Sequence, residues 1–166
     1  MIYGDMCDHN MSKFIRGIDR YPVFPVIDHG HNLIQPVNAR DLGRAYYDVL
    51  VAPDKTSDAT YDLSGKEPMQ LVEVLGLIRS LLGSRARFFN VPRWLALLGA
   101  RILKVISLRR VDAVERVLRM GEDRTCSHEE ATLDFGYSPM SFQDGIRIEI
   151  DEYLRSRKPS NVVNRG

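Results

Sequence analysis

The sequence predicts an α/β fold that lacks part of its sheet, and three observations lead to this prediction. Short extended apolar runs alternate with longer stretches of helical periodicity, as in helices packed on a sheet. No strand–helix–strand unit of normal length is complete. The chain also opens on Met1–Tyr3, an apolar run stopped by Gly4, which is typical of the end of a strand whose beginning is missing. We therefore expect the C-terminal strands of a doubly wound sheet, accompanied by a mainly helical lobe.

The composition is that of one ordinary globular domain, expected over residues 1–158 with a flexible tail over 159–166. The chain has 166 residues, of which 44% are hydrophobic and 27% charged, within the usual range. A net charge of +1 predicts no nucleic-acid partner. Cys7 and Cys126 lie far apart without a CxxC spacing, so we expect no zinc site and a reduced, cytoplasmic protein. The sequence shows neither a signal-peptide pattern nor an apolar run of ~18 residues.

The first half of the chain predicts two helices and two strands. Asn10 is placed to cap a helix that runs to Arg20. Extended runs over 23–27 and 33–37 predict strands, and residues 28–32 between them predict a hairpin-type turn. A second helix is expected over 41–51, with an inward face formed by Leu42, Ala45, Tyr46, Val49 and Leu50.

The second half is predicted to be mainly helical. Gly83 and Gly136 are placed to end helices, because glycine readily takes the left-handed conformation after a last turn. Ser127 and Ser141 each precede an acidic residue by two or three positions and predict helix starts. The elements expected here are a strand over 61–63, a helix over 68–82, a strand over 87–91 and helices over 92–106, 111–120, 127–136 and 141–157.

Six segments, taken in order, carry a resemblance to a known family. They are Met1–Gly4 (MIYG), Gln35–Ala45 (QPVNARDLGRA), Tyr61–Gly65 (YDLSG), Val91–Pro92 (VP), Arg119–Asp123 (RMGED) and Leu133–Gly145, which contains DFGYSP and Phe-x-x-Gly. Together they resemble the second half of extended short-chain dehydrogenases/reductases, the NAD-dependent epimerase/dehydratase family. The resemblance covers nearly the whole chain and implies the C-terminal part of a Rossmann-like protein.

The resemblance implies a division of labour between two lobes. In this family the N-terminal lobe holds NAD or NADP and a catalytic tyrosine–lysine pair, and the C-terminal lobe closes over the substrate, usually a nucleotide-sugar. This sequence has no GxGxxG or GxxGxxG turn, and none of its seven tyrosines is followed by lysine four residues later. We therefore expect no catalytic residue in this chain, which alone should be inactive and hold a dinucleotide poorly.

The resemblance also implies a small set of site residues. Ile2 would lie near the nicotinamide end of the cofactor site, and Asn10, Gln35 and Arg119 would lie on the substrate side. Each substrate-side residue has a plainer interpretation: a helix cap for Asn10, a partner of local backbone for Gln35 and a solvated helix charge for Arg119. Asp41 is expected to be a structural cap or turn residue.

Other features keep alternatives open. Many epimerases of the family carry arginine seven residues before the aspartate of the QPV passage, where this chain has Ile34, so one phosphate anchor is missing or moved. His29 and His31 are expected at an exposed turn without a metal. The basic helix that begins at Pro92 would cover the cleft or lie on a membrane surface. The rival functions are a non-enzymatic binding or scaffold subunit and a peripheral membrane protein, and homo-oligomers are compatible with either.

Overall fold

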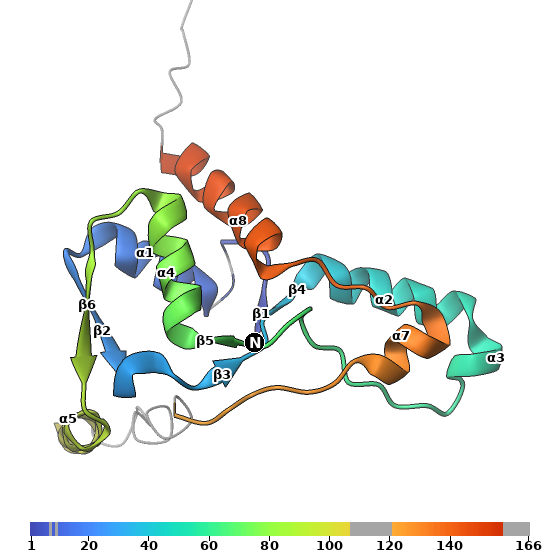
Figure 1. Ribbon diagram of the computed structural model, residues 1–166, viewed down its shortest axis with the longest axis horizontal. Helices are drawn as coiled ribbons and strands as arrows, with labels where there is room; N and C mark the ends of the chain where they lie inside the picture. Colours follow the sequence, from blue (N-terminus) through green and yellow to red (C-terminus); the bar gives the residue numbers. More distant parts are fainter. Residues whose placement is uncertain (7, 9, 107–120, 158–166) are drawn as a thin grey trace, which may run out of the picture.

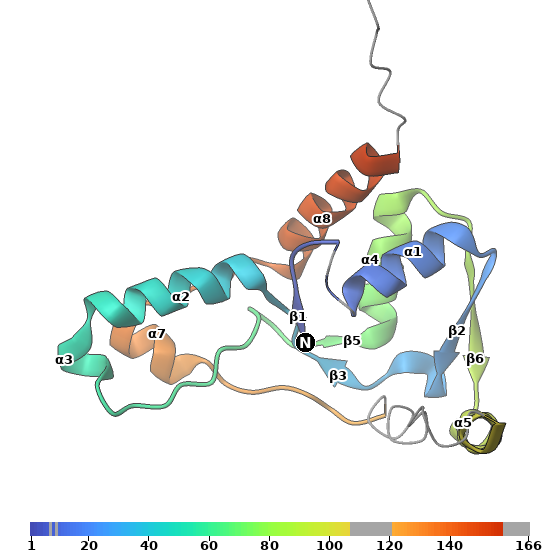
Figure 2. The ribbon, with the colours of Figure 1, turned by 180° about the vertical axis from the view of Figure 1, so that it is seen from behind.

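The computed structural model describes residues 1–6, 8, 10–106 and 121–157. The chain forms a body that contains β2, β6, α1, α4 and α8, and an arm in which α2, α3 and α7 extend away from it (Figures 1 and 2). In order, the elements are β1 (Ile2–Tyr3), α1 (Met11–Arg20), β2 (Val23–Ile27), the 3₁₀ turn η1 (Asp28–Gly30), β3 (Leu33–Ile34), β4 (Val37–Asn38), α2 (Ala39–Val51), α3 (Pro53–Thr56), β5 (Met69–Gln70), α4 (Leu71–Leu82), β6 (Arg87–Val91), α5 (Arg93–Ile106), α7 (Glu129–Phe135) and α8 (Phe142–Arg157).

The strands of the described chain form three two-stranded ladders. β1 pairs with β4 and β2 pairs with β6, both in parallel, with Ile2 opposite Val37 in the first pair. β3 and β5 are antiparallel. Parallel pairs joined through helices are the pattern of a doubly wound sheet. The predicted α/β class, with fragments of a parallel sheet and a mainly helical remainder, is therefore confirmed.

The predicted hairpin between 23–27 and 33–37 is wrong. β2 pairs with β6 and β3 pairs with β5, so the two neighbouring strands do not pair with each other. Between them Asp28, His29 and Gly30 all have left-handed backbone, with φ of 51°, 60° and 68°. The His29 backbone N–H donates to Asn90 Oδ1 at 2.8 Å, which fixes the turn to the end of β6. Partner strands far along the chain decide the pairing here, and the turn follows it.

The strand predicted over 61–63 is also absent, because these residues have no ladder partner among the described residues. Side chains hold the segment instead. The Tyr61 hydroxyl donates to Asp134 Oδ2 at 2.7 Å, and its ring lies edge-on to Phe135. The helix expected over 111–120 lies outside the described residues.

Helix starts follow the sequence only in part. Asn10 precedes α1 but makes no side-chain cap; the Asp8 carboxylate accepts from the backbone N–H groups of Asn10 and Ser12 at 2.7 and 3.2 Å. A carboxylate at this end is favoured because it satisfies unpaired amides and complements the helix dipole. Ser141 accepts from the Asp144 backbone N–H at 3.2 Å, and this confirms the predicted start of α8.

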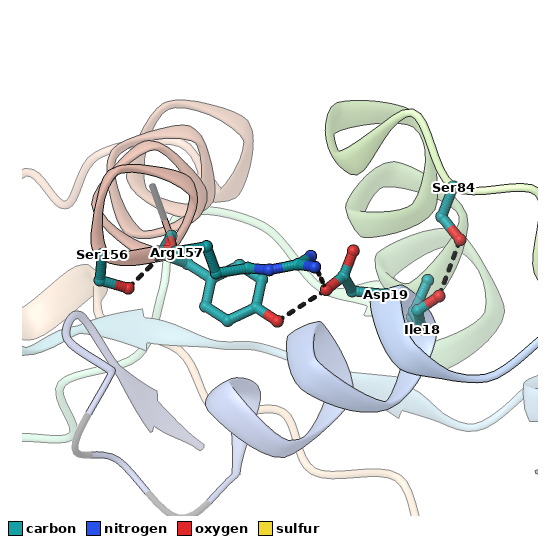
Figure 3. A network of polar contacts seen from close by, with 6 residues as sticks. Ile18, Asp19, Ser84, Ser156 and Arg157 are labelled. Carbon is teal, nitrogen blue, oxygen red and sulfur yellow. Dashed lines mark hydrogen bonds and ion pairs between the residues drawn. The ribbon is translucent and has the colours of Figure 1, made fainter. Parts of the chain in front are cut away.

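The core lies between α1, α4 and α8, and α4 packs against both of the other helices. Its fully buried members include Ile15, Ile78 and Ile150. A polar network ties the same helices together at their outer ends (Figure 3). Asp19 of α1 accepts from the Tyr153 hydroxyl at 2.7 Å and forms an ion pair with Arg157 of α8. These contacts make the body one packed unit.

The face predicted to turn inward on α2 is covered only in part. Of its five members, Ala45 is buried and Leu42 and Val49 are half-buried, whereas Tyr46 is 71% and Leu50 78% exposed. Tyr47 and Val51 add to the exposed apolar surface, and Leu133 of α7 is 80% exposed. Periodicity identified the helix correctly, but the described chain holds too little structure to cover the face.

Candidate functional site

The main site is a cavity of about 780 Å³ between α1, the ends of β2 and β6, and the first turns of α4 and α5. Parallel strands β2 and β6 both point their carboxyl ends at it, through Ile27 and Val91. That is the edge at which ligands bind in open α/β sheets. The residues that line the cavity are Met1, Asn10, Lys13, Phe14, Phe24, Pro25, Val26, Ile27, Asn32, Ile34, Leu71, Leu75, Val91, Ala96, Glu122 and Arg124.

The polar lining comes mainly from two segments. Asn10 and Lys13 lie at the start of α1, and Glu122 and Arg124 lie on the chain that runs beside β3. That chain is held by backbone and carboxylate contacts to Leu33. The Leu33 backbone N–H donates to Asp123 Oδ1 at 2.7 Å, and the Arg124 backbone N–H donates to the Leu33 carbonyl at 2.8 Å. These contacts fix the segment that carries Glu122 and Arg124 beside β3, along the cavity.

Ile34 is buried on the cavity wall and forms a parallel bridge with Arg124. A guanidinium-bearing residue thus lies beside the position at which the resemblance leads one to expect arginine. The sequence analysis predicted Arg119 as a site residue and missed Arg124. Arg124 follows Arg119 by five residues in the sequence, but only its bridge to Ile34 of β3 shows that it lies at the cavity.

The structure brings some predicted site residues together and separates others. Asn10 lines the cavity, as does Met1, which directly precedes Ile2. Ile2 does not line it; it lies on β1 and is 53% exposed. Arg119 lies outside the described residues. His29 and His31 are exposed, with stacked rings 5.7 Å apart. In the described ranges no three His, Cys, Asp or Glu side chains gather as they would around a metal ion.

Gln35 is buried away from the cavity lining and joins three segments. Its amide nitrogen donates to Ser64 Oγ at 2.9 Å and to the Gly65 carbonyl at 2.7 Å. Its amide oxygen accepts from the Cys126 backbone N–H at 3.1 Å. Ser64 also contacts His128 Nδ1 at 3.0 Å, a pair that nothing in the sequence pattern singled out. A buried amide satisfied at both ends stabilises the position of strands β3 and β4 relative to the arm.

The cap of α2 is made by Asn38, whose side chain accepts from the Arg40 backbone N–H, and Asp41 makes a long-range structural contact instead. Its carboxylate accepts from the Met140 backbone N–H at 3.0 Å. It also borders a second cavity of about 360 Å³ between α2 and the end of α7, with Arg44, Asp48 and Tyr137 among its neighbours. Burial raises the pKa of Tyr137 to about 12, so this phenol is neutral and its hydroxyl donates to the Ser64 carbonyl at 2.9 Å.

Glu149 is a buried carboxyl beneath the loop that leads to Asn10. It lies on α8, is 1% exposed, and neither carboxyl oxygen has a hydrogen-bond partner within the described part of the chain. Its pKa is raised from 4.5 to about 8, mainly by burial and also by the nearby Asp8 carboxylate. At neutral pH the group is therefore mainly protonated, because ionising it would create a full charge in a buried site beside another carboxylate.

Comparison with known proteins gives structural matches but no sequence match. No protein-family model and no curated protein sequence matches the chain. UDP-glucose 4-epimerase from Thermotoga maritima, solved with UDP-glucose, superposes with a TM-score of 0.67 at 14% identity, over 93% of this chain and 44% of the epimerase. UDP-glucuronic acid 4-epimerase from Bacillus cereus, in complex with NAD, gives 0.65 at 16% identity over 95% and 44%. dTDP-glucose 4,6-dehydratase from Bacillus anthracis, also in complex with NAD, gives 0.63 at 18% over 95% and 43%.

The chain has the fold of the C-terminal part of these NAD-dependent epimerases and dehydratases. The expected fold is thereby confirmed, since the matches cover nearly all of this chain. The chain spans less than half the length of the solved structures that it matches. At these identities the likeness establishes architecture, whereas activity has to be argued from the site.

Proposed function

We propose that this chain is the substrate-binding part of an NAD(P)-dependent epimerase, dehydratase or related reductase, and that it is inactive alone. The substrate is a nucleotide-sugar or another small hydroxylated molecule. The NAD or NADP and the tyrosine–lysine pair belong to an N-terminal Rossmann half that is not in this chain. A cytoplasmic location is part of the same proposal.

The observation that carries the proposal is the cavity at the carboxyl ends of β2 and β6. Its position matches where ligands bind in open α/β sheets. Met1 and Asn10 line it, so the cavity borders β1, where the resemblance would put the nicotinamide. The matched epimerase structures hold UDP-glucose or NAD.

Two surfaces support the need for a second half. Strand β1 has a ladder partner on one edge only among the described residues, through β4. The apolar face of α2, with Tyr46 and Leu50, lies in solvent. Open ladder edges and exposed apolar faces are the usual sites of assembly or aggregation. We expect the isolated chain to self-associate and to bind a hydrophobic dye.

Two measurements test the proposal first, one on the 166-residue chain and one on the native gene product. Titration of NADH, followed by its fluorescence, is expected to show no saturable binding at micromolar concentrations. The native gene product, detected with an antibody to this chain, is expected at roughly twice the 19.0 kDa of the chain. Micromolar NADH binding would contradict the proposed division of labour. A native product of 19.0 kDa would instead favour a non-enzymatic binding or scaffold subunit.

A second candidate function is association with a membrane surface, and the exposed side of α5 favours it. Trp94, Leu98 and Ile102 recur at helical spacing and are 67%, 48% and 51% exposed, and exposed Arg93 and Arg101 lie on the same helix. Aromatic and aliphatic residues flanked by cations are typical of helices that lie on anionic bilayers. In the described ranges no helix has the length and apolarity needed to cross a bilayer.

Co-sedimentation with liposomes tests the membrane alternative. Vesicles with anionic lipid should retain the chain, and vesicles of neutral lipid should retain less. The variant Leu98→Gln should lower retention if α5 is the contacting face, because it removes apolar area from the middle of the exposed stripe. Equal recovery in the supernatant with both vesicle types would rule this candidate out.

A further inference from the structure

We propose that the interior of the cavity binds the apolar body of a hydroxylated substrate, such as an aliphatic or terpenoid alcohol, and not a sugar ring. This inference rests on the proposed function, in that it takes the cavity to be the substrate site. It goes further by naming the substrate class.

Among the described residues the interior walls are mainly apolar, and the one polar lining side chain that is not exposed is the half-buried Asn32. Phe14, Phe24, Ile34, Leu75 and Val91 are buried or half-buried and come from five different elements. A sugar ring placed among them would lose water around several hydroxyl groups at once. Each hydroxyl buried without a partner costs ~1–3 kcal/mol, so the total would oppose binding. An alkyl or isoprenoid body loses no hydrogen bond and gains the hydrophobic contribution of burial.

Most of the polar lining lies at the mouth. Asn10, Lys13, Glu122 and Arg124 are exposed to solvent, whereas the apolar lining residues other than Pro25 are buried or half-buried. The cavity is therefore amphipathic, with a mainly apolar interior and a polar rim. A molecule with a single polar end matches this distribution. Met1 also lines the cavity directly before β1, so a hydroxyl held near the rim would face the side at which the proposed cofactor half joins.

Ile34 adds a buried apolar side chain to the interior. It is 3% exposed, lies on a two-residue strand with Met69 opposite, and lines the cavity. A volume of about 780 Å³ falls within the range of small-molecule sites, ~300–1,000 Å³. Size therefore permits a whole ligand body, and the lining selects an apolar one.

The test is methyl-labelled NMR on the full 166-residue chain, with octan-1-ol and UDP-glucose as probes at equal concentrations. We expect octan-1-ol to shift the methyl resonances of Ile27 and Ile34 in a saturable way. Ile150, a buried residue of α8 that is not part of the cavity lining, should not shift. UDP-glucose should bind about tenfold more weakly.

Two variants of α5 locate the bound alcohol. Ala96→Phe, which fills the cavity from α5, should weaken octan-1-ol binding about tenfold. Leu95→Phe should not, because it places the same new side chain one position away, at a residue that is 43% exposed and outside the lining.

Each outcome bears on the inference. Tighter binding of UDP-glucose at Ile34 would overturn the apolar class and leave the proposed function standing. Equal effects of Ala96→Phe and Leu95→Phe, or a shift of Ile150 with the others, would place the alcohol elsewhere and overturn the inference. If neither probe perturbs Ile27 or Ile34, the cavity is not a substrate site, and the proposed function fails together with the inference. The wild-type shifts decide these cases even if Ala96→Phe does not fold.

Discussion

Replacing Glu149 with glutamine should stabilise the protein at neutral and basic pH. The carboxyl is 1% exposed, and its pKa is raised from 4.5 to about 8 by burial and by Asp8. Because the folded state holds the proton more tightly than the unfolded state, the group favours folding most below pH 4.5. That contribution is lost as pH rises from 4.5 to 8. Glutamine has nearly the same shape and no proton to lose, so it avoids the loss.

The size of the effect follows from the two pKa values. At pH 7 the carboxyl is ionised in the unfolded state and protonated in the folded state. The pH then lies roughly 2.5 units above the unfolded pKa, and this sets an upper limit of about 3 kcal/mol on the gain in the free energy of unfolding. Movement of the loop over Glu149 would reduce this value. Urea unfolding of wild type and Glu149→Gln at intervals from pH 5 to pH 9 measures it. The exposed carboxyl Asp151 on the same helix supplies the control Asp151→Asn.

The expected signature is a gap between the two unfolding free energies that widens with pH and levels off above about pH 8. The control should show no such widening. A gap that is independent of pH, or a glutamine variant less stable than wild type at pH 8, would refute the reasoning. In that case the carboxyl would have to be ionised and stabilised by a partner.

Three further changes test the fold around the site. A Cβ at Gly65 would lie 1.9 Å from the Pro36 carbonyl oxygen, so Gly65→Ala should lower the melting temperature strongly; Gly43→Ala, with open space around the Cβ, should leave it unchanged or raise it. Gln35→Leu should destabilise by ~1–3 kcal/mol in urea unfolding, because it leaves the buried polar partners of the amide unsatisfied. Tyr153→Phe removes one hydrogen bond between α8 and α1 and should cost about 1 kcal/mol in the same assay. Equal stability of any of these variants and wild type, with the Gly43 variant excepted, would contradict the contact concerned.

Local signals predicted the helices and two strands well. The strands over 23–27 and 87–91 have the expected bounds, and Gly83 and Gly136 end their helices with φ of 62° and 76°. Both results follow from rules that act within a few residues. The pairing of β2 with β6 joins segments that have α2, α3 and α4 between them in the chain, so sequence adjacency wrongly favoured a hairpin. On α2 the periodicity predicted burial correctly for Ala45 and in part for Leu42 and Val49, but Tyr46 and Leu50 are exposed.

The candidate site was predicted less completely than the fold. The resemblance identified Asn10, which lines the cavity, but not Arg124, whose position depends on its bridge to Ile34. Gln35 was recognised as a residue of interest, and its buried contacts with Ser64 and Cys126 come from two distant segments. Residues contributed by one strand or helix end can be found by motif. A cavity wall assembled from six helices and strands needs the three-dimensional structure.

The three ladders also set how the chain reaches its fold. Each joins strands with at least one helix or long segment between them, and two of the three are parallel. The loop between two such strands must close before they pair, so the chain loses conformational entropy before the stabilising contacts form. The contacts between α1 and α8 close a still longer loop, so the helical core and the cavity walls formed by β2, β3 and β6 depend on long-range closures of the same kind. The cavity therefore forms together with the core, and a ligand that fits it should stabilise the whole body.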